Sequence, residues 1–249
     1  MNRIRQERIK EYIESRSVAT IKELQELIPD VSLMTIHRDL DALEKQGVIA
    51  KHRGGVKSIH HPDDVEFNVR MRENNKGKQV MAQKALSLLQ PHSSVFLDAS
   101  TSNLFLARSM PDISLNVVTT GPGVALELCR LHNPAVTVCC GIMNRKNLAI
   151  SGQNTLEMLE KINIDTAFIG VSGCSADVGF TCGTESDMLI KRMLIKKARC
   201  SVMMCSAEKL KRLMPYTFAT LEDVDYIISD EELPEDFVNA AKAEGVILL

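Results

Sequence analysis

The sequence predicts an α/β protein with two domains, a small helical one at the N-terminus and a larger one built on a mostly parallel sheet. Three observations favour this class. Up to Leu43, apolar residues recur at helical spacing. From Val95 onward, short apolar runs alternate with helical stretches, which is typical of a parallel sheet covered by helices. Between these regions, residues 60–64 are polar and interrupted by a proline. We therefore expect domains at residues 1–59 and 80–249, joined by a linker at 60–79.

The N-terminal domain is predicted to begin with two helices. Residues 4–15 form the first, because they carry apolar side chains at near-helical spacing: Ile4, Ile9, Tyr12 and Ile13. After a short extended link, Thr20 and Glu23 have the spacing of a capping box, in which two side chains satisfy two backbone donors at a helix start. The second helix begins there and ends at Pro29-Asp30.

A third helix should follow directly, so that the second and third helices form a helix-turn-helix. Ser32 is a favourable N-cap, and Gly47 suits the left-handed conformation that ends many helices. Between them an apolar stripe is formed by Ile36, Leu40 and Leu43. Turning about 100° per residue from Ile36 leaves the opposite face exposed, with Met34, Arg38 and Asp41 on it and Thr35 and His37 beside it.

A basic β-hairpin is predicted after this helix. Residues 48–50 form a short strand, and the glycine pair Gly54-Gly55 forms a tight tip. The strand leads into the tip through Lys51, His52 and Arg53. A helix-turn-helix followed by such a hairpin is a winged-helix arrangement. The three helices alone would also suit a plain interaction domain.

The larger domain is predicted to contain seven strands and several helices. The strands are expected at residues 95–97, 117–119, 136–140, 166–169, 202–205, 227–229 and 246–248. Helices are expected within 80–89, from Leu104, and at residues 121–131, 152–162, 185–198 and 234–243. In such folds ligands bind beyond the carboxyl ends of the strands.

Two of these strand ends carry short polar side chains that lead into helices. Residues 98–103 follow the first strand, and Thr119-Thr120-Gly121 follow the second. Hydroxyl groups and unpaired N–H groups at a helix N-terminus favour an anion. Each cluster alone would be ordinary helix capping, but two at equivalent places predict a phosphate pocket.

The helix and the hairpin resemble the DNA-binding signature of the DeoR-type family of bacterial sugar-metabolism repressors. The matching residues are Val31-Ser32, Thr35 to Leu40, Leu43-Glu44, Gly47 and Arg53 to Gly55. One departure is His37, where the family has the first arginine of a pair, and imidazole can read a base edge differently from guanidinium. The resemblance implies double-stranded operator DNA as a partner, contacted by Ser32, Leu33, Met34, Thr35, His37, Arg38, Lys51, His52, Arg53, Gly54 and Gly55.

The larger domain resembles the sensor domain of the same family, whose fold is similar to that of ribose-5-phosphate isomerase. The segments that carry this resemblance are Asp98 to Ser102, Thr119-Thr120, Cys140-Gly141, Asp165 to Gly170, Gly179 to Thr181 and Ala207 to Lys209. The resemblance implies a phosphorylated sugar as effector. Its expected contacts are Asp98, Ser100, Thr101, Ser102, Thr119, Thr120, Gly121, Gly141, Gly170, Ser172, Gly173 and Lys209.

Composition excludes several other classes of protein. With 249 residues and 45% hydrophobic content, the chain can bury one large core and one small core. No apolar run is long enough for a membrane span, and the charged N-terminus does not resemble a signal peptide, so we expect a cytoplasmic protein. Seven cysteines, an odd number and mostly in apolar runs, suit reduced packing residues. We expect no metal, no cofactor and no membrane partner.

Charge distinguishes the two domains only weakly. Residues 1–61 carry 11 Lys+Arg and 9 Asp+Glu, a net of +2, which leaves 19 and 23, a net of −4, for the rest. The clustering of basic residues in the hairpin is therefore more informative than the total. Because a single winged helix covers only a short half-site, DNA binding implies a homodimer or homotetramer.

A sugar-phosphate isomerase is the main alternative. The isomerases carry an acidic loop after the strand that matches residues 166–169, whereas residues 170–175 here contain no carboxylate. Proton transfer needs a positioned carboxylate base, so we expect no enzymatic activity and no catalytic residue. Glu185 and Asp187 are the nearest carboxylates, and surface or ligand-hydroxyl contacts suit them better. A DNA-binding protein with a vestigial sensor is a third possibility.

Overall fold

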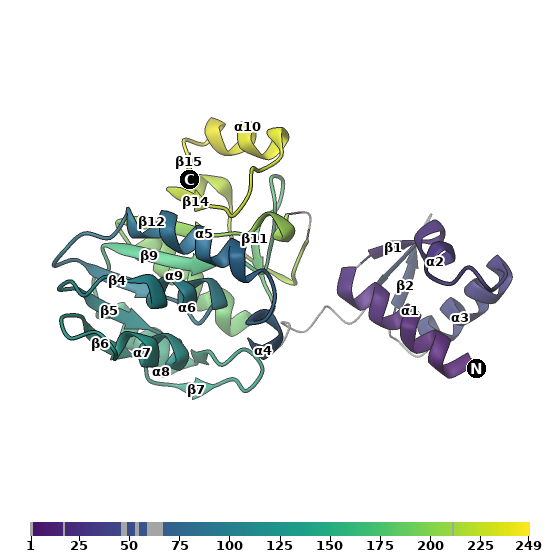
Figure 1. Ribbon diagram of the computed structural model, residues 1–249, viewed down its shortest axis with the longest axis horizontal. Coiled ribbons are helices and arrows are strands. Elements are labelled where there is room, and N and C mark those ends of the chain that lie inside the picture. The colour runs from purple at the N-terminus through teal and green to yellow at the C-terminus, as the bar shows by residue number, and fades with distance from the viewer. Residues whose placement is uncertain (1, 17, 46–48, 53–54, 59–66, 211) are drawn as a thin grey trace. The chain divides into compact units, whose positions relative to one another are not determined.

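The computed structural model of the protein describes residues 2–16, 18–45, 49–52, 55–58, 67–210 and 212–249. The chain divides into two compact units, residues 1–63 and residues 64–249. Figure 1 labels the helices and strands of each unit. We describe the two units separately.

The smaller unit contains three helices and a three-stranded antiparallel sheet. Its elements in chain order are α1 (Asn2–Arg16), β1 (Val18–Thr20), α2 (Ile21–Leu27), α3 (Leu33–Lys45), β2 (Ile49–His52) and β3 (Gly55–Ser58). The strand order is β1-β3-β2. The expected link at Val18-Ala19 is thus a strand, and it pairs with the hairpin. The predicted helix end at Gly47 and the hairpin residues Val48, Arg53 and Gly54 lie outside the described residues.

Local sequence signals account for this arrangement. Thr20 Oγ1 accepts a hydrogen bond from Glu23 N at 3.2 Å, and Glu23 accepts one from Thr20 N at 2.7 Å, so the predicted capping box is confirmed. The core is formed by the predicted stripe Ile36, Leu40 and Leu43 together with Ile9, Ile13, Leu24, Ile49 and Val56. These side chains hold helix α3 against α1 and the sheet.

An ion pair fixes α1 to α3. The Asp39 side chain is only 1% exposed, and its carboxylate accepts hydrogen bonds from Arg5 Nε at 2.5 Å and from Gln6 Nε2 at 3.1 Å. A buried carboxylate needs such partners, because an unpaired one would be strongly destabilising. Arg5 therefore has a structural role.

The larger unit is a three-layer α/β/α structure around a seven-stranded sheet. The strand order is β15-β14-β12-β9-β4-β5-β6, and every neighbouring pair is parallel. These strands are β4 (Ser94–Leu97), β5 (Asn116–Thr119), β6 (Ala135–Val138), β9 (Thr166–Gly170), β12 (Cys200–Met204), β14 (Tyr226–Ile228) and β15 (Ile247–Leu248). The seven predicted strands are therefore the seven strands of this sheet, with ends that differ by a few residues.

Helices cover both faces of the sheet, as a parallel sheet requires. The first face packs against α5 (Asn75–Leu86), α6 (Thr101–Ser109) and α7 (Pro122–Leu128). The second packs against α8 (Gln153–Glu160), α9 (Glu185–Lys197) and α10 (Glu235–Ala243). Side chains of β4 alternate between the two, since Val95 and Leu97 join the first core and Phe96 joins the second. Figure 1 shows these layers.

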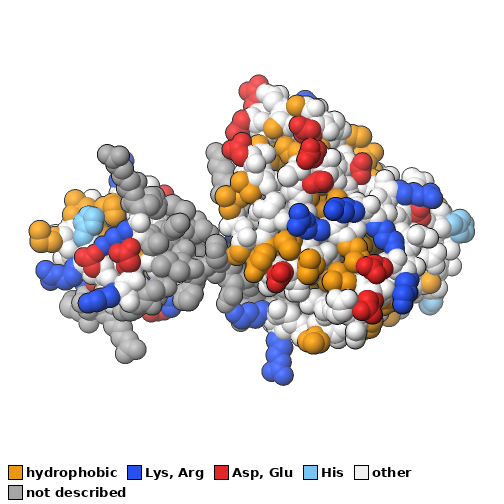
Figure 2. Space-filling model, turned by 180° about the vertical axis from the view of Figure 1, so that it is seen from behind, with side chains coloured by type: hydrophobic (Ala, Val, Ile, Leu, Met, Phe, Trp, Pro, Cys, Tyr) orange, Lys and Arg blue, Asp and Glu red, His pale blue; other side chains and the backbone are white. Residues whose placement is uncertain are grey.

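Smaller elements surround the sheet near the ends of its strands. They are α4 (Phe67–Arg70), the hairpin β7 (Ile142–Met143) and β8 (Ile150–Ser151), the sheet of β10 (Gly173–Ser175), β11 (Gly179–Cys182) and β13 (Tyr216–Ala219), and the 3-10 turns η1 (Ala207–Lys209) and η2 (Leu221–Asp223). On the face drawn in Figure 2, acidic, basic and apolar side chains are interspersed. That face therefore presents no broad surface of one charge.

The expected linker overlaps with folded structure. Residues 67–79 include α4 and the first turn of α5, which belong to the larger unit. Phe67 N donates to Lys146 O at 2.8 Å, which attaches the start of α4 to the loop between β7 and β8. The sequence pattern missed this because α4 is a single turn, too short to show helical periodicity.

Candidate functional site

Five of the eleven residues expected to contact DNA belong to α3, and four of these five are exposed. Met34 is 74% exposed, and Leu33, His37 and Arg38 are exposed as well. Ser32 Oγ accepts a hydrogen bond from Thr35 N at 3.3 Å, as an N-cap does. An exposed apolar side chain such as Met34 has no role in the core of this unit, so this face is available to a partner.

The hairpin is held against α3 by acidic residues. Lys51 N donates to Glu44 Oε1 at 2.8 Å, and the Lys51 ammonium forms ion pairs with Asp41 and Glu44. Of the other predicted hairpin contacts, His52 ends β2 and Gly55 begins β3, whereas Arg53 and Gly54 lie outside the described residues. Lys51 thus fixes the position of the hairpin relative to α3.

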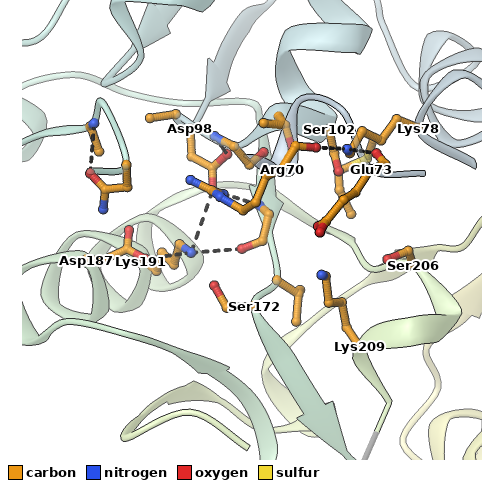
Figure 3. Close-up of a pocket in the computed structure, with 18 of the residues that line it drawn as sticks. Arg70, Glu73, Lys78, Asp98, Ser102, Ser172, Asp187, Lys191, Ser206 and Lys209 are labelled. Carbon is orange, nitrogen blue, oxygen red and sulfur yellow. Dashed lines mark hydrogen bonds and ion pairs between the residues drawn. The ribbon is translucent and has the colours of Figure 1, made fainter. Parts of the chain in front are cut away.

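A polar pocket lies at the carboxyl ends of β4, β9 and β12 in the larger unit (Figure 3). Seven of the predicted ligand contacts line it: Asp98, Ser100, Thr101, Ser102, Gly170, Ser172 and Lys209. They come from three separate segments, the β4–α6 loop, the end of β9 with the residues after it, and η1. Parallel strands bring these segments to one edge of the sheet.

Asp98 organises the β4–α6 loop. Its side chain is only 5% exposed, and its carboxylate accepts hydrogen bonds from Ser100 N at 2.9 Å, Asn103 Nδ2 at 2.7 Å and Gly170 N at 2.7 Å. These bonds join the ends of β4 and β9 and use most of the acceptor sites of the carboxylate. Asp98 therefore stabilises the conformation of the β4–α6 loop.

The start of helix α6 forms one wall of the pocket. Ser100 is the N-cap, and its Oγ accepts a hydrogen bond from Asn103 N at 3.2 Å. Thr101 and Ser102 are the first two residues of the helix, and both line the pocket. The partial positive charge and unpaired N–H groups of a helix start favour an anion there.

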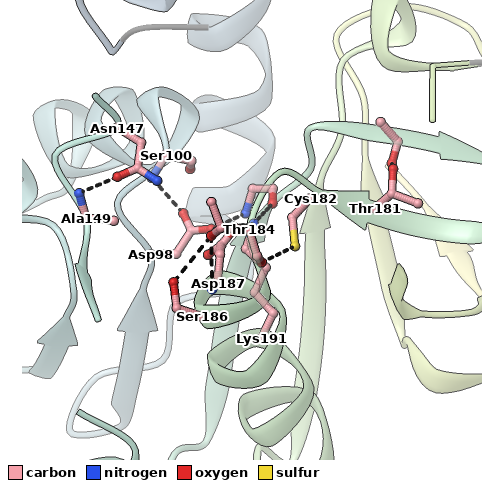
Figure 4. A network of polar contacts seen from close by, with 12 residues as sticks. Asp98, Ser100, Asn147, Ala149, Thr181, Cys182, Thr184, Ser186, Asp187 and Lys191 are labelled. Carbon is pink, nitrogen blue, oxygen red and sulfur yellow. Dashed lines mark hydrogen bonds and ion pairs between the residues drawn. The ribbon is translucent and has the colours of Figure 1, made fainter. Parts of the chain in front are cut away.

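Lys191 lies beneath the pocket and balances its carboxylates. It is only 4% exposed, and its Nζ lies 2.8 Å from Asp187 Oδ2, 2.8 Å from Gly170 O and 3.8 Å from Asp98 Oδ2. Burial alone would lower the pKa of Lys191, but the two carboxylates outweigh burial and raise the pKa above its usual value. Figure 4 shows this group of polar contacts, which continues to Thr184, the N-cap of α9.

Lys78, from the first turn of α5, is a second buried cation in the pocket. It is 7% exposed, and its Nζ donates to the carbonyl oxygens of Arg70 and Glu73 (Figure 3). It forms no ion pair with any described residue. Burial first, and the positive charge of Lys209 second, lower the pKa of Lys78. A buried ammonium without a carboxylate partner would be stabilised by an anion in the pocket.

Five predicted contacts do not line this pocket. Thr119 is buried, and its Oγ1 accepts a hydrogen bond from Gly121 N at 2.9 Å, while Thr120 is buried as well. A Cβ on Gly121 would lie 2.9 Å from Ala99 Cα, so this turn packs tightly against the β4–α6 loop. Gly173 is likewise buried, against the backbone of Arg212, whereas Gly141 is exposed and adopts a positive φ of 147° beside Thr155. The second polar cluster is thus a buried turn at the end of β5, and no side chain caps the start of α7.

Asp187, for which the sequence suggests a surface or ligand-hydroxyl contact, also lines the pocket. Twelve further lining residues were not predicted: Arg70, Glu73, Lys78, Ala99, Asn147, Ala149, Val171, Lys191, Met204, Ser206, Glu208 and Arg212. Two of these had a detectable signal. Lys78 precedes Met81, Ala82 and Ala85 at helical spacing, and Lys191 precedes Leu194 and Ile195 in the same way. A lysine inside an apolar stripe is rarely buried without a partner, so it marks a polar site.

Two further observations concern groups that the sequence analysis considered. All seven cysteines are free thiols, including the buried pair Cys174 and Cys205, whose sulfur atoms are 3.3 Å apart. Burial, followed by the neighbouring Cys140, raises the pKa of Cys139 to about 12. Within the described part of the chain, no helix is both long enough and apolar enough to cross a membrane.

Family models match both units. The model described as DeoR-like helix-turn-helix domain matches residues 5–61, and the model described as DeoR C terminal sensor domain matches residues 73–231. The second match alone covers more than half of the chain.

Curated relatives match this chain over nearly its whole length. The uncharacterized HTH-type transcriptional regulator YgbI of Escherichia coli is 32% identical, covering 98% of this chain and 96% of that protein. The HTH-type transcriptional repressor GlcR of Bacillus subtilis is 27% identical, covering 97% and 93%. The L-fucose operon activator of Escherichia coli is 27% identical, covering 93% and 96%.

Among solved structures, a ribose 5-phosphate isomerase A from Methanocaldococcus jannaschii is similar to about half of this chain. It is 13% identical, covers 53% of this chain and 53% of that chain, and has a TM-score of 0.38.

Proposed function

We propose that this chain, which belongs to the DeoR family of DNA-binding transcriptional regulators, represses a carbohydrate-metabolism operon and releases its DNA when a phosphorylated sugar binds. The observation that carries the effector class is the composition of the pocket. A helix start with hydroxyl side chains faces a buried lysine that has no carboxylate partner among the described residues. That combination suits a phosphate, while Glu73 and Ser172 suit sugar hydroxyl groups.

The chain is a regulator and not a sugar-phosphate isomerase. Its relatives are named as transcriptional regulators, and residues 170–175 carry no carboxylate beside the pocket. Asp187 does line the pocket, but it forms an ion pair at 2.8 Å with the buried Lys191. A carboxylate held in this way by an ammonium is a poor proton acceptor, because protonation would break the ion pair.

For DNA, we assign the exposed face of α3 to the major groove. Leu33, Met34 and His37 would lie closest to the base edges, while Ser32, Thr35 and Arg38 would bind phosphates and fix the register. The hairpin would add contacts to the phosphate backbone of the DNA, through His52, Arg53, Gly54 and Gly55. Lys51 would mainly position the hairpin, because its ammonium already pairs with two acidic side chains.

Substitutions on α3 test this assignment. Arg38→Ala should weaken binding to all DNA sequences and reduce the salt dependence of binding by about one unit, because one phosphate contact is lost. His37→Ala should change sequence preference instead. Lys22→Ala, an exposed substitution on α2, serves as the control. An unchanged salt dependence for Arg38→Ala would exclude that residue from the phosphate contacts.

The effector is tested by thermal unfolding of the full chain with pentose and hexose phosphates and their unphosphorylated parents. A ligand at 100 times its dissociation constant adds about 2.7 kcal/mol to the stability of the domain that binds it. Stabilisation by one phosphate and not by its parent sugar would support the proposal. If no member of a broad panel stabilises the protein, while operator DNA still binds, the sensor is vestigial.

Two copies of the chain are needed for one operator, because each presents a single α3 to the groove. We therefore propose a homodimer or homotetramer. Sedimentation of the protein with and without operator DNA tests this, and a monomer bound to a single half-site would contradict it. Transcription assays with and without the effector separate repression from activation, since the names of the relatives include both.

A further inference from the structure

Asp230 joins two walls of the pocket although it lies outside the pocket itself. Its Oδ1 accepts a hydrogen bond from Ala207 N at 2.8 Å, and its Oδ2 accepts one from Asn74 Nδ2 at 2.6 Å. Ala207 begins η1, which brings Lys209 to the pocket. Asn74 directly follows Glu73, which lines the pocket from the other side. One carboxylate therefore links segments that are more than a hundred residues apart in sequence.

Asn74 is built into the start of α5. It adopts a left-handed conformation, with φ of 46°, and its Oδ1 accepts a hydrogen bond from Gly77 N at 3.2 Å. Its carbonyl oxygen accepts one from Lys78 N at 3.1 Å. Because its amide nitrogen is used by Asp230, both ends of the Asn74 side chain are engaged.

Lys78 closes the same segment. Its ammonium donates to the carbonyl oxygens of Arg70 and Glu73, so residues 70–78 form one hydrogen-bonded loop around this cation. Arg70, Glu73 and Lys78 all line the pocket. The position of this loop relative to η1 is set by the two bonds of Asp230.

The negative charge of Asp230 strengthens its hydrogen bonds to Ala207 and Asn74. Within the described residues it forms no ion pair, and its carboxylate accepts from a backbone N–H, a side-chain amide and, at 3.4 Å, the hydroxyl of the adjacent Ser229. Hydrogen bonds to a carboxylate are stronger than those between neutral groups. An asparagine in its place would have to direct its own NH₂ group toward one of the two donors, so it could keep only one of the bonds.

We propose that Asp230 is a positioning residue that couples ligand binding in the pocket to the position of residues 70–78. The proposal rests on the proposed function. An anionic ligand that draws Lys209 toward it moves η1, and Asp230 transfers the displacement to Asn74. In the sequence, residues 70–78 follow the DNA-binding unit. Through their position, the ligand can favour the arrangement of the protein that releases DNA over the one that binds it.

Hydrogen exchange of the full chain tests this coupling, with a mixture of ribose 5-phosphate, glucose 6-phosphate and fructose 6-phosphate as the probe. In the wild type, the probe should slow exchange in residues 98–104 and also change exchange in residues 67–78, the latter by about fivefold or more. Asp230→Asn should keep the effect at 98–104 and lose the effect at 67–78. Asn74→Gly should reproduce this loss, because glycine retains the left-handed conformation and removes the amide that binds Asp230, together with the cap on Gly77 N.

Glu231→Gln is the matched control, since it removes the neighbouring, exposed carboxylate. It should behave as the wild type does. If Asp230→Asn leaves the probe-dependent change at 67–78 intact, the coupling proposal is wrong while the effector proposal stands. If the probe protects 98–104 in no variant, the wild type included, the pocket does not bind these sugar phosphates, and both proposals fail.

Discussion

Lys191 and Lys78 show how the surroundings of a single residue determine its role. Both are lysines at apolar positions of helices, and both are buried beside the same pocket. Lys191 lies between two carboxylates, so its charge is balanced within the protein. Among the described residues, the hydrogen-bond acceptors of Lys78 are two carbonyl oxygens, so an anionic ligand would complete its environment. The same residue type thus stabilises the fold in one position and prepares a binding site in the other.

Replacing Lys191 should destabilise the larger unit. Lys191→Met leaves Asp187 and Asp98 without their cation, and breaking a buried ion pair costs about 3–5 kcal/mol. Because the pKa of Lys191 is raised, its contribution is fully present below the unfolded value of about 10.4, so the loss should be constant from about pH 6 to 9. Urea unfolding measures it, with the exposed Lys196→Met on the same helix as control. A loss below 1 kcal/mol would contradict this account.

Ser102 offers a way to remove ligand binding without removing stability. It is the second residue of α6, where an acidic side chain stabilises a helix. Ser102→Asp should therefore fold normally, and its carboxylate should repel a phosphate and abolish the thermal shift caused by the effector. Ser102→Asn, similar in size and uncharged, should keep much of the response. Equal responses from the two variants would mean that the phosphate binds elsewhere.

At the scale of elements, the position of α3 depends on α1. The Asp39 carboxylate is buried on the inner face of α3 and holds Arg5 and Gln6 of α1, whereas the exposed residues of α3 lie on the opposite face. The inner face thus positions α3, and the outer face is the one that we propose binds DNA. The same separation occurs in the larger unit, where Asp98 braces the loop whose outer hydroxyl groups line the pocket.

Asp39→Ala should loosen this arrangement. It removes hydrogen bonds to a charged group, which contribute about 1.5–3 kcal/mol, and it leaves Arg5 without its partner. We expect lower stability of the smaller unit and weaker binding to every DNA sequence, with base preference unchanged. Asp30→Asn, at an exposed position before α3, is the control. A variant with full stability and altered base preference would place Asp39 at the DNA instead.

At the scale of the whole molecule, the two units predict two unfolding transitions, because their hydrophobic cores are separate. The core of the smaller unit shares no residue with the two cores of the larger unit. Calorimetry should therefore resolve two transitions, and the effector should raise the temperature only of the one that belongs to the larger unit. Operator DNA should raise the other. A single transition shifted by both ligands would show that the units unfold together.

The sequence by itself determined what depends on neighbours along the chain. The capping box at Thr20, the apolar stripe of α3 and the seven strands all follow from local spacing, and the structure has them. The family follows from the linear order of a few residues around α3 and the hairpin. The hydroxyl side chains at the start of α6 could also be recognised, because they are consecutive in sequence, and anion binding there stays a prediction.

Only the tertiary structure decided which of the predicted ligand-binding residues lie together in one pocket. Strand order places the ends of β4, β9 and β12 around the pocket, while Thr119 at the end of β5 packs against the neighbouring loop and is buried. Lys78 and Asp187 enter the pocket from helices that flank opposite faces of the sheet. Local periodicity contains no information on such distances, because they are set by the packing of two helical layers on a sheet.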